Sequence, residues 1–149
     1  MIRNYKDSDY TKIRSCLKKA GHFDSIKDTK ENLKKKMRAS PGSIIVAIED
    51  GKVVGCQYII FDYFSSFLFR LCVDEKHRHK GIGGLLMREA EKRVKKKGIK
   101  KVSILVREPE LDHLKKFYLE GRYKPVPFKH QILNRKSKMK EFRRPFLLF

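Results

Sequence analysis

Residues 73–86 read V-D-E-K-H-R-H-K-G-I-G-G-L-L and combine a run of basic side chains with three glycines. Glycine lets the backbone turn tightly and approach a ligand without an intervening side chain. If a helix begins at the glycines, its free N–H groups and dipole attract anions, and Arg78, His79 and Lys80 strengthen the same field. The stretch predicts a phosphate-binding loop. The alternative is a tight turn in which the glycines serve only the path of the chain.

The residues on either side favour the phosphate-binding interpretation. A short apolar run at residues 67–73 is typical of a strand, and after the loop apolar residues recur at helical spacing as far as Gly98. The loop lacks the G-x-x-x-x-G-K-[ST] pattern of a Walker loop and departs from the G-x-G-x-x-G dinucleotide fingerprint. A strand, a loop and a helix therefore indicate a phosphate-binding element of a different kind.

Arg78, Gly81 and Gly83 fill the three fixed positions of [Q/R]-x-x-G-x-[G/A]. The loop thus resembles the acyl-coenzyme A pyrophosphate signature of the GNAT superfamily of N-acetyltransferases. This resemblance implies that acetyl-coenzyme A is the cosubstrate and that no metal is needed. It also implies that the pantetheine arm inserts beside the strand before the loop. The cofactor-binding residues that it implies are Leu71, Cys72, Val73, Arg78, His79, Lys80, Gly81, Ile82, Gly83 and Gly84.

A second stretch agrees with the first. Residues 101–106 predict a strand and residues 110–121 a helix carrying Phe117-Tyr118, which is similar to the C-terminal GNAT motif F-Y-x-x-x-G-F. Here the motif reads F-Y-L-E-G-R-Y, so Arg122 stands at the position of the family's glycine. Leu111 stands where the family commonly has an asparagine.

The resemblance implies direct attack of an amine on the acetyl thioester, with Tyr118 protonating the departing thiolate. A backbone N–H of Cys72 or Val73 is the expected donor to the oxyanion. The alternative for Tyr118 is a core tyrosine beside Phe117.

The general base is the least defined part of the site. Residues 67–73 contain no acid, and Leu105 stands where the ribosomal-protein N-terminal acetyltransferases have a glutamate. Glu108 is our candidate base, and Asp62 and His113 are alternatives; for each of them the other interpretation is a solvated side chain.

The pattern along the chain predicts alternating strands and helices. Expected strands cover residues 2–5, 44–48, 52–61, 67–73, 101–106 and 130–133, and expected helices cover residues 9–20, 25–39, 82–97 and 110–121. The resemblance implies an α/β (α+β) fold in one GNAT-like domain spanning residues 1–149. Its central sheet is expected to be mixed and mostly antiparallel, with six to seven strands and helices on both faces.

Composition narrows the class of protein further. The sequence shows no apolar run long enough to span a membrane and no secretory signal, which predicts a cytoplasmic enzyme. Cys16, Cys56 and Cys72 are widely spaced within apolar patterns, so we expect buried thiols rather than a disulfide or a zinc site. His77 and His79 form an H-x-H pair that we expect to add polarity beside phosphate rather than to bind a metal.

The charge of the chain is extreme. It carries 37 Lys and Arg residues against 17 Asp and Glu residues, a formal net charge of +20 over 149 residues. Such a field attracts coenzyme A, which is a polyanion. Two interpretations of the excess charge stay open: a partner such as RNA, a ribosome or an acidic protein, and lysine-rich helical faces that are merely solvated.

Taken together, the sequence predicts an N-acetyltransferase that moves an acetyl group from acetyl-coenzyme A to a primary amine in a ternary complex. The sequence does not specify the acceptor, which is a protein N-terminus, a lysine or a small amine. The alternative function is a noncatalytic or moonlighting protein on the same fold that binds a polyanion such as RNA or the ribosome. A monomer and a homodimer both fit the sequence.

Overall fold

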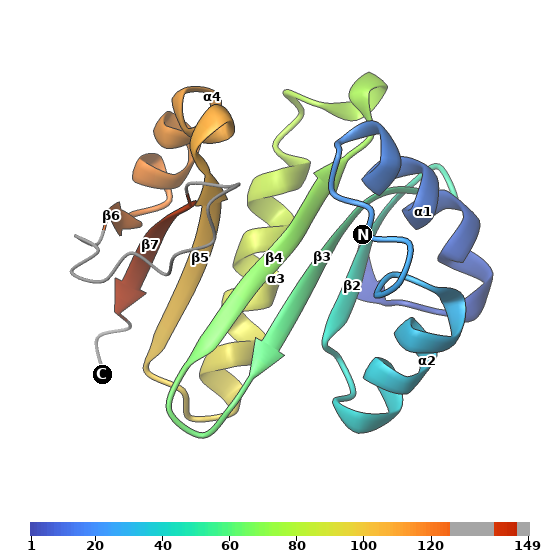
Figure 1. The fold of residues 1–149 in the computed structure, drawn as a ribbon, viewed down its shortest axis with the longest axis horizontal. Helices are drawn as coiled ribbons and strands as arrows, with labels where there is room; N and C mark the ends of the chain where they lie inside the picture. The colour runs from blue at the N-terminus through green and yellow to red at the C-terminus, as the bar shows by residue number, and fades with distance from the viewer. Residues whose placement is uncertain (126–138, 146–149) are drawn as a thin grey trace.

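One mixed sheet organises the chain (Figure 1). The computed structural model describes residues 1–125 and 139–145, with residues 105–111, 125 and 139–145 described by their backbone alone. The strand order is β1-β2-β3-β4-β5-β7-β6. The bounds are β1 (Ile2–Asn4), β2 (Ile44–Glu49), β3 (Lys52–Phe61), β4 (Ser66–Val73), β5 (Lys101–Arg107), β6 (Lys124–Pro125) and β7 (Met139–Pro145).

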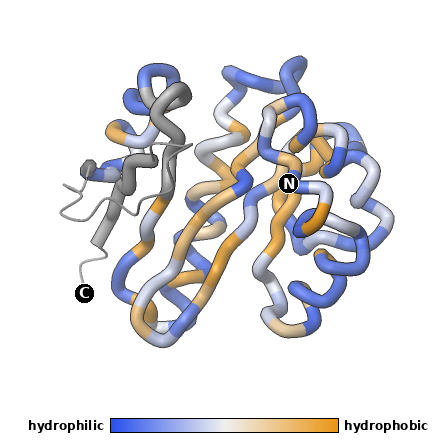
Figure 2. The backbone as a smooth tube through the Cα atoms, in the orientation of Figure 1, coloured by the Kyte–Doolittle hydropathy of each residue, from blue (hydrophilic) through white to orange (hydrophobic). Residues whose placement is uncertain are grey.

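Helices cover both faces of this sheet and enclose two apolar clusters. The α1 helix (Tyr10–Lys19) and the α2 helix (Lys30–Ala39) pack on one face, where Ile13, Leu17 and Leu33 are buried. The α3 helix (Ile82–Lys96) and the α4 helix (Glu108–Glu120) pack on the other face, around Leu86 and Tyr118. Figure 2 shows hydrophobic residues concentrated along the central strands. The expected mixed α/β architecture is confirmed.

The second helix begins five residues later than the expected start at residue 25. Asp24 is responsible, because its Oδ1 accepts the N–H groups of Ile26 and Lys27 at 2.9 Å each and holds them in a turn. Thr29 then caps α2, with its hydroxyl oxygen accepting the N–H of Asn32 at 3.2 Å. Asp and Thr side chains thus set a boundary that the apolar spacing alone did not show.

The pairing of β4 with β5 is short. It is parallel and covers three residue pairs, Ser66 with Val102, Phe67 with Ser103 and Leu68 with Ile104, and the other paired strands described here are antiparallel. Beyond these pairs the two strands diverge toward their C-terminal ends (Figure 1). The divergence leaves the second half of β4 without a paired neighbour on its β5 side within the described register.

A bulge lies in that second half of β4. Cys72 pairs with Cys56 and Phe69 pairs with Tyr58, so Arg70 and Leu71 together oppose one residue of β3. Arg70 adopts a φ of 55°, in the left-handed region. The extra residue breaks the alternation of side chains, and Phe69 and Arg70 both contact the α1–α2 side of the sheet.

The expectation of three free thiols is wrong. A disulfide joins Cys16 of α1 to Cys72 of β4, with their Cα atoms 6.3 Å apart, and only Cys56 stays a buried free thiol. Burial raises the pKa of the Cys56 thiol to about 12. Sequence spacing did not reveal the bond, because α1 and β4 meet only through the packing of the helix on the sheet.

Two described strands follow α4. The strand expected at residues 130–133 falls outside the described residues, and the observed pair is β6 with β7, with β7 also paired to β5. Among the described helices, none is both long and apolar enough to cross a bilayer.

Reduction of the Cys16–Cys72 disulfide is expected to lower the free energy of unfolding by about 2–4 kcal/mol, because the bond restricts the unfolded chain. The bond spans 56 positions of the sequence. Urea unfolding with and without dithiothreitol measures the change, and a Cys16→Ser variant should not respond to the reductant. Identical midpoints for the wild-type protein in both buffers would contradict this assignment.

Candidate active site

The connection from β4 to α3 leaves a helix start open to solvent. Gly81 is the N-cap residue with a φ of 79°, and α3 begins at Ile82. The N–H groups in the first turn of a helix lack carbonyl partners within that helix, so they bind an anion together with the helix dipole. A Cβ added at Gly81 would meet no atom within 4 Å, so the space above it is open. The strand-loop-helix expected from the sequence is present.

The basic side chains of the loop surround this helix start. Arg78, His79 and Lys80 are all exposed. Arg78 Nε donates to the carbonyl of Val73 at 3.2 Å, and Lys80 Nζ lies 3.5 Å from a carboxylate oxygen of Glu49 at the end of β2. Arg78 and Lys80 are therefore held near Gly81 by contacts with the ends of two strands.

Asp74 holds the beginning of the same loop. It accepts the N–H of Lys76 at 3.1 Å and lies 3.4 Å from Nδ1 of His77. The Lys76 hydrogen bond is the main reason that the pKa of Asp74 lies below its ordinary value. His77 also approaches Glu49, at 3.4 Å. In the part of the chain that the structure describes, no group of three or more His, Cys, Asp or Glu residues is placed to hold a metal ion.

The expected cleft residues Leu71, Cys72 and Val73 lie on the diverging half of β4. Leu71 and Val73 pack partly against the core under α3, while the sulfur of Cys72 points to the opposite face and bonds to Cys16. Their backbone therefore runs along the β4–β5 divergence, and their side chains serve the two faces of the sheet.

Two aromatic rings connect α4 to the glycine loop. A Cβ added at Gly83 would lie 3.5 Å from the Phe117 ring, so Phe117 packs directly over the first turn of α3. Tyr118 is 5% exposed, and its ring centroid lies 5.2 Å from that of Phe117 and 6.1 Å from that of Tyr123. The structure thus places Tyr118 within the core cluster of this face, next to the residue that touches the loop.

The candidate bases occupy different places. Glu108 is the first residue of α4, directly after β5, and its side chain lies outside the described part. His113 is exposed on α4. Asp62 lies in the β3–β4 turn, at the opposite end of β4 from the glycine loop, where its Oδ1 accepts the N–H groups of Phe64 and Ser65. These hydrogen bonds hold the pKa of Asp62 below its ordinary value, so Asp62 is a turn residue.

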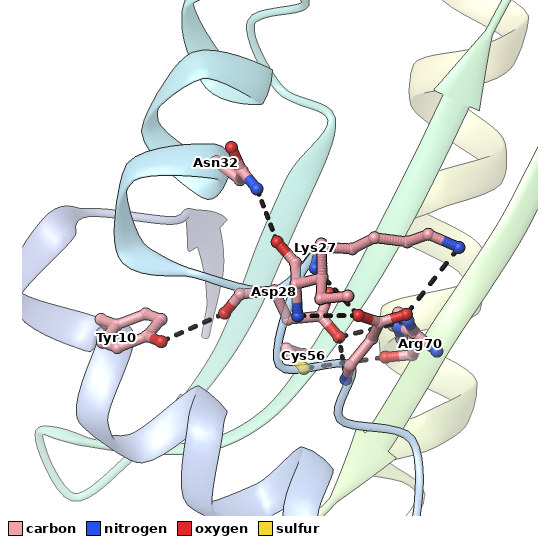
Figure 3. Close-up of polar contacts among 8 residues, drawn as sticks. Tyr10, Lys27, Asp28, Asn32, Cys56 and Arg70 are labelled. Atoms are coloured by element: carbon pink, nitrogen blue, oxygen red, sulfur yellow. Dashed lines mark hydrogen bonds and ion pairs between the residues drawn. The ribbon is translucent and has the colours of Figure 1, made fainter.

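Sequence reasoning missed an ion pair on the diverging half of β4. Arg70 Nη2 lies 3.2 Å from Asp28 Oδ2, which joins the β4 bulge to the segment between α1 and α2 (Figure 3). The signal was present, because Arg70 interrupts the apolar run of residues 67–73. An arginine on a central strand requires a specific reason, since unpaired charges are rarely buried.

A basic groove of about 820 Å³ lies away from the glycine loop, between the outer face of α3 and the turn after α4. Cations outnumber acids among its lining residues, which are Arg88, Glu91, Lys92, Lys95, Lys96, Glu120, Gly121 and Arg122. Glu91 accepts a hydrogen bond from the Tyr123 hydroxyl at 2.8 Å, so its carboxylate links α3 to this turn.

Comparison with known proteins adds a family and a fold. The model of the acetyltransferase (GNAT) family matches residues 8–121. Ard1 from Thermoplasma volcanium has a similar structure, with a TM-score of 0.84, 19% sequence identity, and coverage of 99% of this chain and 98% of that one. A search of the curated proteins finds no match to the sequence.

Two further structures share the fold and contain coenzyme A. PaiA N-acetyltransferase from Thermoplasma acidophilum, in complex with coenzyme A, has a TM-score of 0.78 at 21% identity, covering 98% of both chains. An aminoglycoside 6'-N-acetyltransferase complexed with coenzyme A has a TM-score of 0.79 at 14% identity, covering 100% of this chain and 98% of that one. At these identities the likeness concerns the fold.

Arg122→Gly is expected to raise the free energy of unfolding by about 1 kcal/mol, because a side chain in the left-handed region crowds its own carbonyl. Arg122 follows α4 with a φ of 65°, and the next N–H, from Tyr123, returns to the carbonyl of Tyr118 at 2.9 Å. Urea unfolding of this variant beside Arg122→Ala separates backbone strain from loss of charge. An equal gain in both variants would contradict the explanation.

Proposed function

The chain belongs to the GNAT acetyltransferase family, and we propose that it transfers an acetyl group from acetyl-coenzyme A to a primary amine. The observation that carries this proposal is the position of the open helix start. Gly81 and the first turn of α3 lie directly beyond the β4 end where β4 and β5 diverge. An anion site and a gap between parallel strands are thus adjacent, which suits an elongated ligand with a phosphate at one end.

The residues around the helix start fit a pyrophosphate. Gly81, Gly83 and Gly84 bring backbone N–H groups to the surface without side chains, and Arg78 and Lys80 add positive charge. Along the divergence, the backbone of Leu71, Cys72 and Val73 offers hydrogen-bonding groups to the pantetheine arm. When bound, acetyl-coenzyme A supplies a thioester whose carbonyl carbon accepts the amine.

In the proposed reaction the amine nitrogen forms a bond to the acetyl carbon, and the bond from that carbon to sulfur breaks. A backbone N–H of Cys72 or Val73 is the proposed donor to the carbonyl oxygen, where negative charge develops. Tyr118 is the proposed acid that gives its proton to the leaving sulfur, and Glu108 is the proposed acceptor of the proton from the amine. The position of Tyr118 beside Phe117, which packs on Gly83, supports its role.

Tyr118→Phe is expected to leave the Kd for acetyl-coenzyme A unchanged and to lower kcat by roughly 10²–10⁴-fold, the usual contribution of a general acid. Release of free thiol in the presence of a panel of amines measures turnover, and calorimetry measures binding. Gly83→Trp is the companion variant, and it should lose binding because its side chain would meet Phe117 and fill the cradle. Full activity of Tyr118→Phe would contradict the assigned acid.

A second candidate function, binding of a polyanion such as RNA, is favoured by the basic groove along α3. Exposed aromatic rings add to it, since Tyr63 and Phe64 are 95% and 88% exposed at the β3–β4 turn. Lys97 lies over the neighbouring Phe61 ring at 4.9 Å. Cations bind phosphates and exposed rings stack on bases, so the groove and the β3–β4 turn each offer a feature that binds single-stranded nucleic acid.

Lys92→Glu with Lys96→Glu is expected to weaken binding of a short single-stranded RNA by at least about tenfold, because each change removes a phosphate contact. Lys12→Glu with Lys18→Glu on α1 makes the same change of charge elsewhere and is the matched control. Fluorescence anisotropy at several salt concentrations measures the affinities. Equal weakening in both double variants would assign RNA binding to net charge rather than to the groove.

A further inference from the structure

Arg70 is a partly buried cation on the diverging half of β4. The bulge turns it toward the α1–α2 side, where its side chain is 22% exposed. Its Nε is buried and has no hydrogen-bond partner within the described part of the chain. A buried donor without a partner destabilises the folded state, because it has lost its hydrogen bonds to water. The protein therefore keeps a guanidinium at this point whose hydrogen-bonding capacity it does not fill.

The surroundings of Arg70 are suited to an anion. Arg70 lies 6.0 Å from the centroid of the Phe69 ring, and Lys36 Nζ lies 5.6 Å from the same centroid. Lys36 also donates to the carbonyl of Ile59 at 2.9 Å, and burial lowers its pKa. Two cations from different elements, β4 and α2, thus border one aromatic ring on β4.

Asp28 supplies an internal carboxylate to Arg70. It is 3% exposed, and its Oδ2 lies 3.2 Å from Arg70 Nη2 and accepts the N–H of Asp24 at 2.8 Å. The carbonyl of Asp28 accepts the Tyr10 hydroxyl at 3.1 Å (Figure 3). These contacts hold the segment between α1 and α2 so that the Asp28 carboxylate pairs with the Arg70 guanidinium. A substrate carboxylate would make the same kind of contact.

Arg70 faces the α1–α2 side of the sheet, where Asp28 contacts it. The α3 and α4 helices pack on the opposite face, together with the glycine loop. An acceptor that reaches the unpaired half of β4 from the α1–α2 side would meet Arg70.

We propose that Arg70 is a specificity-determining residue that binds a carboxylate on the acceptor, so the acceptors are amines that also carry an acid group. Amino acids and peptides with an acidic group near the reacting amine belong to this class. The inference rests on the proposed acetyltransferase function. In the free protein, Asp28 occupies one donor of the guanidinium, and the acceptor carboxylate takes donors that Asp28 does not use.

The test compares amines that differ only in the acid group: ω-amino acids of increasing chain length and their amides. Wild-type protein is expected to acetylate at least one acid with a KM roughly 10–100-fold below that of its amide, the range of a charge-assisted hydrogen bond. Arg70→Gln should raise the KM for that acid to the value for the amide. It should leave the KM for the amide unchanged, and Arg70→Lys should restore part of the preference.

Arg38→Gln removes an equal charge at the exposed end of α2 and is the matched control for the long-range field. Asp28→Asn removes the internal anion and should lower the KM for the acid. Arg70→Gln and Asp28→Asn are both expected to lower the melting temperature, because each breaks a partly buried ion pair. A purely structural ion pair predicts a different kinetic result: both variants would change the KM for acid and amide alike. That result, or a wild-type protein indifferent to the acid group, would overturn the proposal.

Direct titration of the wild-type protein and Arg70→Gln with the same acid and amide, without acetyl-coenzyme A, gives a readout that does not depend on transfer. Preferential binding of the acid that Arg70→Gln abolishes would support the carboxylate site even if no acetyl group is transferred. In that case it is the acetyltransferase function that fails. Equal binding of acid and amide would overturn the site whatever the transfer assay shows.

Discussion

The geometry of the site depends on the short parallel pairing between β4 and β5. Three residue pairs join the strands, and the strands then diverge. A continuous pairing would close the gap in which the pantetheine arm is proposed to lie. The bulge at Arg70 falls in the same half of β4. The left-handed φ of Arg70 interrupts the regular pairing of β4 with β3 at that point. One strand therefore borders the divergence, leads to the helix start, and places a charged side chain on the opposite face.

Contacts from distant parts of the chain hold that strand in place. The Cys16–Cys72 disulfide fixes its α1–α2 side, and Asp28 reaches the bulge from the segment between the two helices. On the other face, Phe117 packs on the first turn of α3. At the C-terminal end of the strand, the Arg78 side chain donates a hydrogen bond to the carbonyl of Val73. The divergence is thus stabilised from both faces of the sheet, which favours a cleft that is formed before any ligand arrives.

Local sequence patterns predicted much of this fold, and the contacts between distant residues were beyond them. The loop at Arg78, Gly81 and Gly83 was recognisable because turn chemistry and helix initiation act over a few residues. The late start of α2 needed the hydrogen bonds of Asp24, and the disulfide needed the packing of α1 on β4. Arg70 was visible as an interruption of an apolar run, but its partner Asp28 lies 42 positions away and no spacing rule connects them. Arg122 is a third case. It stands where the family motif has glycine, and its backbone has the left-handed conformation that glycine adopts readily.

The measurement that tests the central claim most directly is calorimetric titration of the protein with acetyl-coenzyme A at moderate salt, beside ATP and a short RNA. A cleft that holds the pantetheine arm contributes contacts that salt does not screen, whereas binding to the +20 surface alone weakens steeply with salt. The account predicts one acetyl-coenzyme A per chain, bound more tightly than ATP and retained as the salt concentration rises. Binding of ATP or RNA as tight as that of acetyl-coenzyme A, with the same salt dependence, would contradict it.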